Sequence, residues 1–70
     1  MIKFNTVEYD YHPGISLREL AEAYYSEFPN MDFEDFIVVV NNSALTSLQA
    51  EGKKLNDNDI VYFVPKLDGG

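Results

Sequence analysis

Residues 15–28 read ISLRELAEAYYSEF, and this stretch decides the fold that the sequence predicts. It begins as a helix should, because Ser16 is a good N-cap and Glu19, three residues later, completes a capping box. Apolar residues then recur at helical spacing and form one stripe: Leu17, Leu20, Ala21, Tyr24 and Phe28. Pro29 disfavours helical backbone at the residue before it. The pattern therefore predicts one helix over residues 17–28, with a single face for packing.

Short alternating or β-branched segments lie on both sides of this helix. The predicted strands are residues 2–11, folded as a hairpin about Asn5-Thr6, then 37–40, 44–46 and 60–64. The run Ile37-Val38-Val39-Val40 is β-branched throughout, which predicts a strand buried on both faces or nearly so. Residues 47–52 are expected to be irregular or a helical turn. Asn41-Asn42 predicts a turn, because asparagine tolerates left-handed backbone.

The order of these segments predicts the architecture. A hairpin, a helix, a strand, a short strand and a last strand pack most simply as an α+β domain. We expect a β-grasp fold, in which a mixed four- to five-stranded sheet carries one main helix on one face. Strands 2–5 and 60–64 should lie side by side and parallel at the centre of that sheet. Residues 1–65 are expected to form the β-grasp domain, and residues 66–70 a flexible tail ending in Gly-Gly.

Composition excludes several classes of function. The chain has 70 residues, no cysteine and a net charge of −7. Without cysteine there are no disulfides, no thiolate metal sites and no thiol catalysis. The negative charge repels phosphate backbones, so nucleic-acid binding is not expected. No stretch of the sequence approaches the length of a membrane span, and because the first residues already alternate as a strand we expect no leader. We expect a cytoplasmic protein that is a monomer when free.

The position of Gly69-Gly70 gives this ending a chemical meaning. The pair follows the last strand and Pro65 with only three residues between. Without side chains, the two glycines can pass through a narrow channel and reach an enzyme's reacting centre. A carboxylate is an unreactive electrophile, but ATP can convert it to an acyl-adenylate that a sulfur nucleophile or an amine attacks.

The whole chain resembles the ThiS/MoaD family of ubiquitin-like sulfur carrier proteins. The resemblance is carried by these features: the hairpin start, the capped helix, Val38-Val39-Val40-Asn41, Leu55-Asn56-Asp57-Asn58-Asp59-Ile60-Val61, and the final Gly69-Gly70. The family's usual turn reads Asp-Gly-Asp, and Asn58 stands here in place of the glycine. Asparagine is the next best residue for left-handed backbone, so the departure is mild.

The resemblance implies a route and a set of partners. A ubiquitin-activating-type adenylating enzyme would activate the Gly70 carboxylate, which becomes a thiocarboxylate and gives its sulfur to a synthase. Leu67, Asp68 and Gly69 would be recognised with the tail. The synthase would be thiazole synthase or the molybdopterin synthase large subunit. The protein would then be a co-substrate and not an enzyme, with no bound cofactor, because the partner enzyme uses the ATP.

Several readings of the function stay open. The short hairpin-to-helix opening and the compact spacing after Val40 favour thiamine (thiazole) biosynthesis. Phe63-Val64-Pro65 looks more like the molybdopterin synthase small subunit. Other carriers of this fold serve tRNA thiolation or cysteine synthesis. A ubiquitin-like modifier joined to lysines through Gly70 is a further alternative, as is a non-covalent β-grasp binding module whose Gly-Gly ending is incidental.

The last strand also predicts a surface. If Val61 and Phe63 meet the helix, alternation places Tyr62 and Val64 on the open face of the sheet. There they either form a partner-docking patch or are covered by the chain's own loops.

Polar residues elsewhere predict no metal site. His12 has no second histidine or cysteine to join it, and we expect it to be an exposed loop residue. Asp57 and Asp59 lack the ligands that would complete a calcium loop, so a solvated turn is expected.

Overall fold

The computed structural model describes residues 1–66. Its strands are β1 (Ile2–Phe4), β2 (Val7–Tyr9), β3 (Phe36–Val40), β4 (Ser43–Leu45) and β5 (Ile60–Pro65). Its helices are α1 (Leu17–Tyr24), α2 (Ser47–Glu51) and two 3-10 turns, η1 (Phe28–Asn30) and η2 (Phe33–Asp35). Of the predicted tail, Lys66 is described, and residues 67–70 lie outside the described residues.

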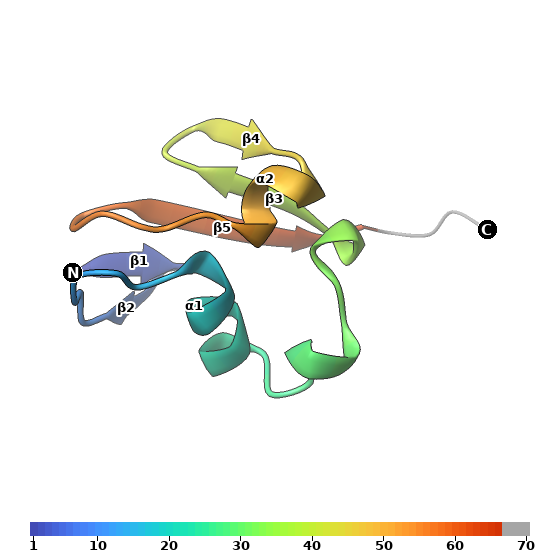
Figure 1. Cartoon of the computed structure of the whole chain (residues 1–70), viewed down its shortest axis with the longest axis horizontal. Coiled ribbons are helices and arrows are strands. Elements are labelled where there is room, and N and C mark those ends of the chain that lie inside the picture. Colours follow the sequence, from blue (N-terminus) through green and yellow to red (C-terminus); the bar gives the residue numbers. More distant parts are fainter. Residues whose placement is uncertain (67–70) are drawn as a thin grey trace.

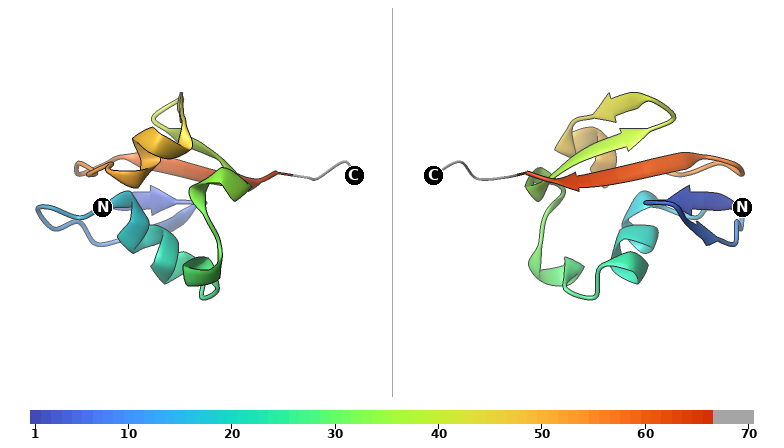
Figure 2. Two further views of the ribbon diagram at one scale, coloured as in Figure 1. Left: turned by 45° about the vertical axis from the view of Figure 1, so that its right-hand side comes forward. Right: turned by 180° about the vertical axis from the view of Figure 1, so that it is seen from behind.

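Within residues 1–66 the strands form one five-stranded sheet in the order β2-β1-β5-β3-β4. The β1–β5 pair is parallel, with Lys3 opposite Ile60, and the other three pairs are antiparallel. The main helix α1 packs on one face of this mixed sheet (Figures 1 and 2). The predicted α+β β-grasp fold is thereby confirmed, including the two parallel strands near the sheet centre.

Left-handed residues shape three of the turns. Asn5 and Thr6 have φ of 47° and 70°, and Asn41 and Asn42 have φ of 50° and 68°. Two consecutive left-handed residues give the two-residue hairpin loops that match strand twist. Asn58 has φ of 70°, so asparagine does take the backbone for which glycine is usual. Among these left-handed residues Thr6 costs the most conformational energy, because β-branched residues rarely adopt left-handed backbone.

Helix α1 is shorter than predicted, because it ends at Tyr24 and not at residue 28. The N-terminus behaves as expected, since the Glu19 amide donates to Ser16 Oγ at 3.1 Å. At the other end Tyr25 has extended backbone, and its ring centroid lies 5.0 Å from that of Phe36. Phe28 reaches the core from η1 instead. Core packing of Tyr25 and Phe28 overrides the local helical pattern, and Pro29 lies inside a 3-10 turn.

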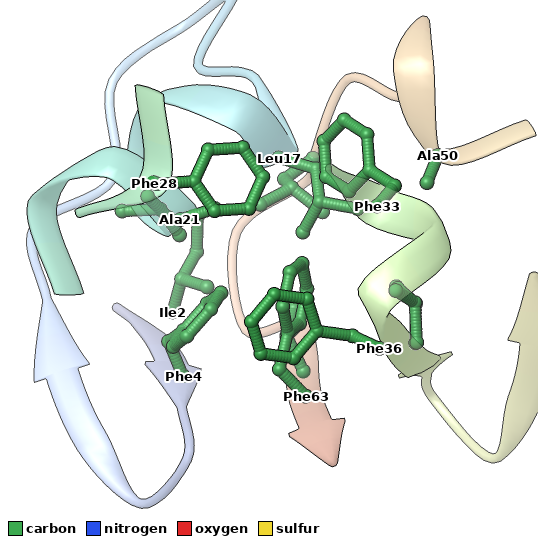
Figure 3. Packing of buried hydrophobic residues seen from close by; sticks show 14 of the residues in the cluster. Ile2, Phe4, Leu17, Ala21, Phe28, Phe33, Phe36, Ala50 and Phe63 are labelled. Atoms are coloured by element: carbon green, nitrogen blue, oxygen red, sulfur yellow. The ribbon is translucent and has the colours of Figure 1, made fainter. Parts of the chain in front are cut away.

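The core lies between the sheet and the helices and is dominated by aromatic rings. Phe63 on β5 is at its centre, with ring centroids of Phe4, Phe36 and Phe33 at 4.8, 5.2 and 6.0 Å. Figure 3 shows these rings facing one another beneath the helices. In a chain of this size such dense aromatic burial supplies most of the available stabilisation.

Strand β3 is buried on one face only, so the predicted burial of both faces is wrong. Phe36, Val38 and Val40 point into the core, whereas Ile37 is 49 % exposed. The helices cover only one face of the sheet, because α1 and α2 pack on the same side of it. The β-branched residues here favour strand backbone, and they do not imply that both faces of the strand are buried.

The Asp57–Asp59 turn is only partly the solvated turn that was expected. Asp57 is exposed and pairs with the N-terminal ammonium at 2.6 Å, which lowers the pKa of its carboxyl. Asp59 is buried, and its carboxylate accepts hydrogen bonds from Asn41 Nδ2 and the Asn56 amide, both at 2.8 Å. The prediction is wrong for Asp59, because this turn packs against the β3–β4 loop.

Candidate functional site

The described part of the chain ends where β5 leaves the sheet. The Lys66 amide donates to the carbonyl oxygen of Asp35 at 2.9 Å, one step beyond the Phe36–Pro65 pair. The β3–β5 ladder therefore holds the base of the tail up to Lys66. The sequence-predicted site residues Leu67, Asp68, Gly69 and Gly70 lie outside the described residues, and their roles remain predictions.

One face of strand β5 packs into the core, and the other face is exposed. Val61 and Phe63 are buried, whereas Ile60, Tyr62 and Val64 are 42 %, 45 % and 50 % exposed. This alternation is the one that the sequence predicted if Val61 and Phe63 met the core. Tyr62 and Val64 thus lie uncovered on the open face of the sheet, on the strand that leads into the tail.

Strand β3 extends the exposed apolar surface beside β5. Ile37 lies opposite Val64 in the antiparallel register, and Val39 lies opposite Tyr62. Together with Ile60 on β5, these four residues form what we call the open-face patch. A contiguous apolar patch of this kind is typical of a protein-binding surface.

Sequence reasoning missed Ile37 and Val39 as members of the patch. The β-branched run Ile37-Val38-Val39-Val40 predicted a strand buried on both faces or nearly so. The signal that could have found them is the period of two that begins at Phe36, once a single helix is assumed to cover one face.

The remaining polar candidates behave as isolated surface groups. His12 is exposed, and its Nε2 lies 3.0 Å from Glu19 Oε2. That hydrogen bond, aided by the Pro13 carbonyl, raises the pKa of His12. Across residues 1–66, no group of three or more acidic or histidine side chains gathers that could hold a metal ion. In the same range, no helix is both long and apolar enough to cross a membrane.

The fold defines the class of protein, a ubiquitin-like β-grasp domain. The family model described as the ThiS family matches residues 2–70, and the chain belongs to this family. Members of the family are small sulfur carriers that work with adenylating and synthase partners and are not themselves catalysts. Among curated proteins, none matches the chain.

Proposed function

We propose that this protein carries sulfur for thiazole formation in thiamine biosynthesis, as a thiocarboxylate on Gly70. The observation that supports this most directly is the family match, which runs through the C-terminal Gly69-Gly70. The short hairpin-to-helix opening and the compact spacing after Val40 resemble the thiamine branch of the family. The proposed location is the cytoplasm.

The proposed chemistry takes place in the active site of the adenylating enzyme, and the Gly70 carboxylate is the group of this chain that reacts. The Gly70 carboxylate attacks the α-phosphorus of ATP and releases pyrophosphate, which leaves an acyl-adenylate. Hydrosulfide released by the sulfur donor then attacks the acyl carbon and displaces AMP, which leaves the thiocarboxylate. The carrier supplies a carboxylate and a recognisable body, while the adenylating enzyme binds the ATP. Leu67, Asp68 and Gly69 are the proposed recognition residues of the tail.

The open-face patch supplies the proposed docking surface for the adenylating enzyme and then for the thiazole synthase. Tyr62 and Val64 lie on the strand that becomes the tail, so a partner that covers them also receives the tail. Both partners need the same terminal carbon, so sharing one surface makes their binding sequential. Because these side chains are half exposed, removing them costs little folding energy.

The test is to incubate the protein with its adenylating enzyme, ATP and a sulfur donor. Mass spectrometry should show one oxygen replaced by sulfur, confined to Gly70. Deletion of Gly70 or addition of one residue after it should abolish the modification, because either change moves the carboxylate away from the nucleotide. A Gly69→Phe variant should be slowed by obstruction and should unfold like the parent. Equal modification of the truncated and extended chains would refute the proposal.

Phe63-Val64-Pro65 favours a second candidate, the molybdopterin synthase small subunit. The two are separated by supplying the thiocarboxylated carrier to thiazole synthase or to the molybdopterin synthase large subunit. Sulfur consumption by the second enzyme alone would favour the alternative. Lysine-linked adducts in place of a thiocarboxylate would indicate a protein modifier.

A further inference from the structure

A hollow of about 480 Å³ opens at the end of the sheet where β5 ends. It lies among four consecutive elements, η2, the start of β3, the end of β4 and the start of α2, and Lys66 joins them from the far end of the chain (Figure 1). Its lining residues are Phe33, Glu34, Phe36, Ile37, Leu45, Thr46, Ser47 and Lys66. The proposed function makes no use of this hollow, although Lys66 forms both one of its walls and the base of the tail.

The lining combines an apolar floor with a polar rim. Phe33 and Phe36 are only 1 % and 3 % exposed, and the Arg18 guanidinium already lies 5.1 Å from the centroid of the Phe33 ring. The apolar surface open in the hollow therefore comes from Ile37 and the partly buried Leu45. On the rim, Ser47 Oγ lies 3.4 Å from Glu34 Oε1 and donates to it. Thr46 Oγ1 is already used, because it accepts from the Gln49 amide and caps α2. The rim therefore offers the Glu34 carboxylate as its main acceptor.

The charge around this rim favours a cation. In the described part of the chain, the ion pairs involve Asp57, Glu19, Glu22 and Glu51, and Glu34 is in none of them. At the 3-10 turn η2, the Asp32 amide donates to Asp35 Oδ2 at 2.8 Å and the Asp35 amide donates to the Asp32 carbonyl oxygen at 3.0 Å. Lys66 is the opposing charge on the rim, on a long and exposed side chain. The net charge of −7 adds a general preference for a basic partner.

We propose that this hollow receives an arginine side chain of the adenylating enzyme. The partner's identity rests on the proposed function. A guanidinium pairs with Glu34 through its planar fork while its stem lies along Ile37 and Leu45. Arginine fits better than lysine because its planar fork can make two hydrogen bonds to one carboxylate and because a guanidinium is less strongly hydrated than an ammonium.

The hollow is continuous with the open-face patch, which supports a shared interface. Ile37 lines the hollow and is also a member of the patch, opposite Val64. A partner on the open face can therefore reach round the end of the sheet into the hollow. Because the Lys66 backbone is fixed to Asp35, a side chain seated there holds the base of the tail at a defined angle to the enzyme.

The decisive variant is Glu34→Gln, with Glu27→Gln as the matched control. Glu27 is exposed and lines neither the hollow nor the patch. In an adenylation assay, E34Q should raise the KM for the carrier about tenfold, the loss expected for one charge-assisted hydrogen bond. Its kcat and its thermal unfolding should equal those of the parent, and E27Q should change none of these values.

Lys66→Gln tests whether the side chain that enters the hollow is positively or negatively charged. Removing this cation should lower the KM for the carrier, since it relieves repulsion of the incoming guanidinium. A hollow that receives an acidic side chain would reverse both results, with K66Q raising the KM and E34Q lowering it. That reversal would overturn the proposal.

A second measurement does not depend on the adenylating enzyme. N-acetyl-arginine amide is titrated into the 15N-labelled full chain, with N-acetyl-glutamine amide as the neutral control. The arginine probe should shift the amide signals of Glu34, Ser47 and Lys66, and E34Q should remove these shifts.

The two measurements separate the possible failures. If the parent is never adenylated, the proposed function fails, and the arginine titration alone decides the hollow. If the parent is adenylated and E34Q keeps the parental KM, the hollow proposal is overturned while the proposed function stands. If the parent is not adenylated, amide shifts with N-acetyl-arginine amide that are no larger than those with N-acetyl-glutamine amide would also overturn the hollow proposal.

Discussion

Phe63 and Tyr62 are neighbours in β5 that face opposite sides of the sheet, so their alanine variants should separate folding from docking. Phe63 is 3 % exposed and lies among four other phenylalanine rings, with centroids 4.8–6.4 Å away. Tyr62 is 45 % exposed and faces Val39 across the strand pair. Both substitutions remove one ring from the same strand, and only the face differs.

The expected magnitudes follow from burial. Truncating a buried phenylalanine to alanine costs about 3–5 kcal/mol, from lost transfer energy and the cavity that remains. A core of this size supplies about 3–5 kcal/mol of net stability, so Phe63→Ala should leave the domain largely unfolded. Tyr62→Ala loses strand propensity and one half-exposed pair, about 1 kcal/mol. The two variants should therefore differ by about 2–4 kcal/mol.

Urea unfolding followed by far-ultraviolet circular dichroism measures this difference. With a urea m-value of about 1 kcal/mol/M, Tyr62→Ala should lower the midpoint by about 1 M. Phe63→Ala should lack a folded baseline. In the adenylation assay, folded Tyr62→Ala should show a raised KM for the carrier. Equal destabilisation by the two substitutions would refute the assignment of the faces, and an unchanged KM would refute docking through Tyr62.

Three further predictions test local features. Thr6→Gly should raise the free energy of unfolding by about 0.5–1 kcal/mol, because relief of left-handed β-branched backbone exceeds the added chain entropy; a lower urea midpoint would contradict this. The pKa of His12 is raised by Glu19 from its ordinary 6.5, so this pair's contribution is fully present below pH 6.5 and is lost as pH rises through the folded value. His12→Gln should flatten that pH dependence of the urea midpoint, and an unchanged slope would contradict it. Asp59→Ala should lower the free energy of unfolding by about 2 kcal/mol, because the Asn41 amide and a backbone donor lose their acceptor; a thermal midpoint equal to the parent's would show that water replaces it.

The division of faces explains how a small domain can both fold and dock. One face of the sheet, covered by α1 and α2, holds the aromatic core. The other face is exposed and is the proposed docking surface, and it carries Ile60, Tyr62 and Val64 of β5. Substitutions on the two faces should therefore have nearly independent effects on stability and on partner binding.

Local sequence signals determined much of this protein. Ser16 set the start of α1, the asparagine-rich pairs set the hairpin turns, and alternation in residues 60–64 set the two faces of β5. These features depend on a residue and its near neighbours, so they can be read from a few letters of sequence. The order of the elements then left the β-grasp as the compact arrangement. The Gly-Gly ending and the wider resemblance predicted the family.

Only the tertiary structure decided the features that depend on contacts between distant segments. Helix α1 ends at Tyr24 because the Tyr25 ring packs on Phe36, eleven positions later. Asp59 is buried because the loop at Asn41 packs against it. The hollow brings together Glu34, just before β3, and Lys66, just after β5, because the antiparallel pairing places these two positions at the same end of the sheet. No local pattern contains this information, because burial and cavities arise from which elements pack together and not from the residues of any one element.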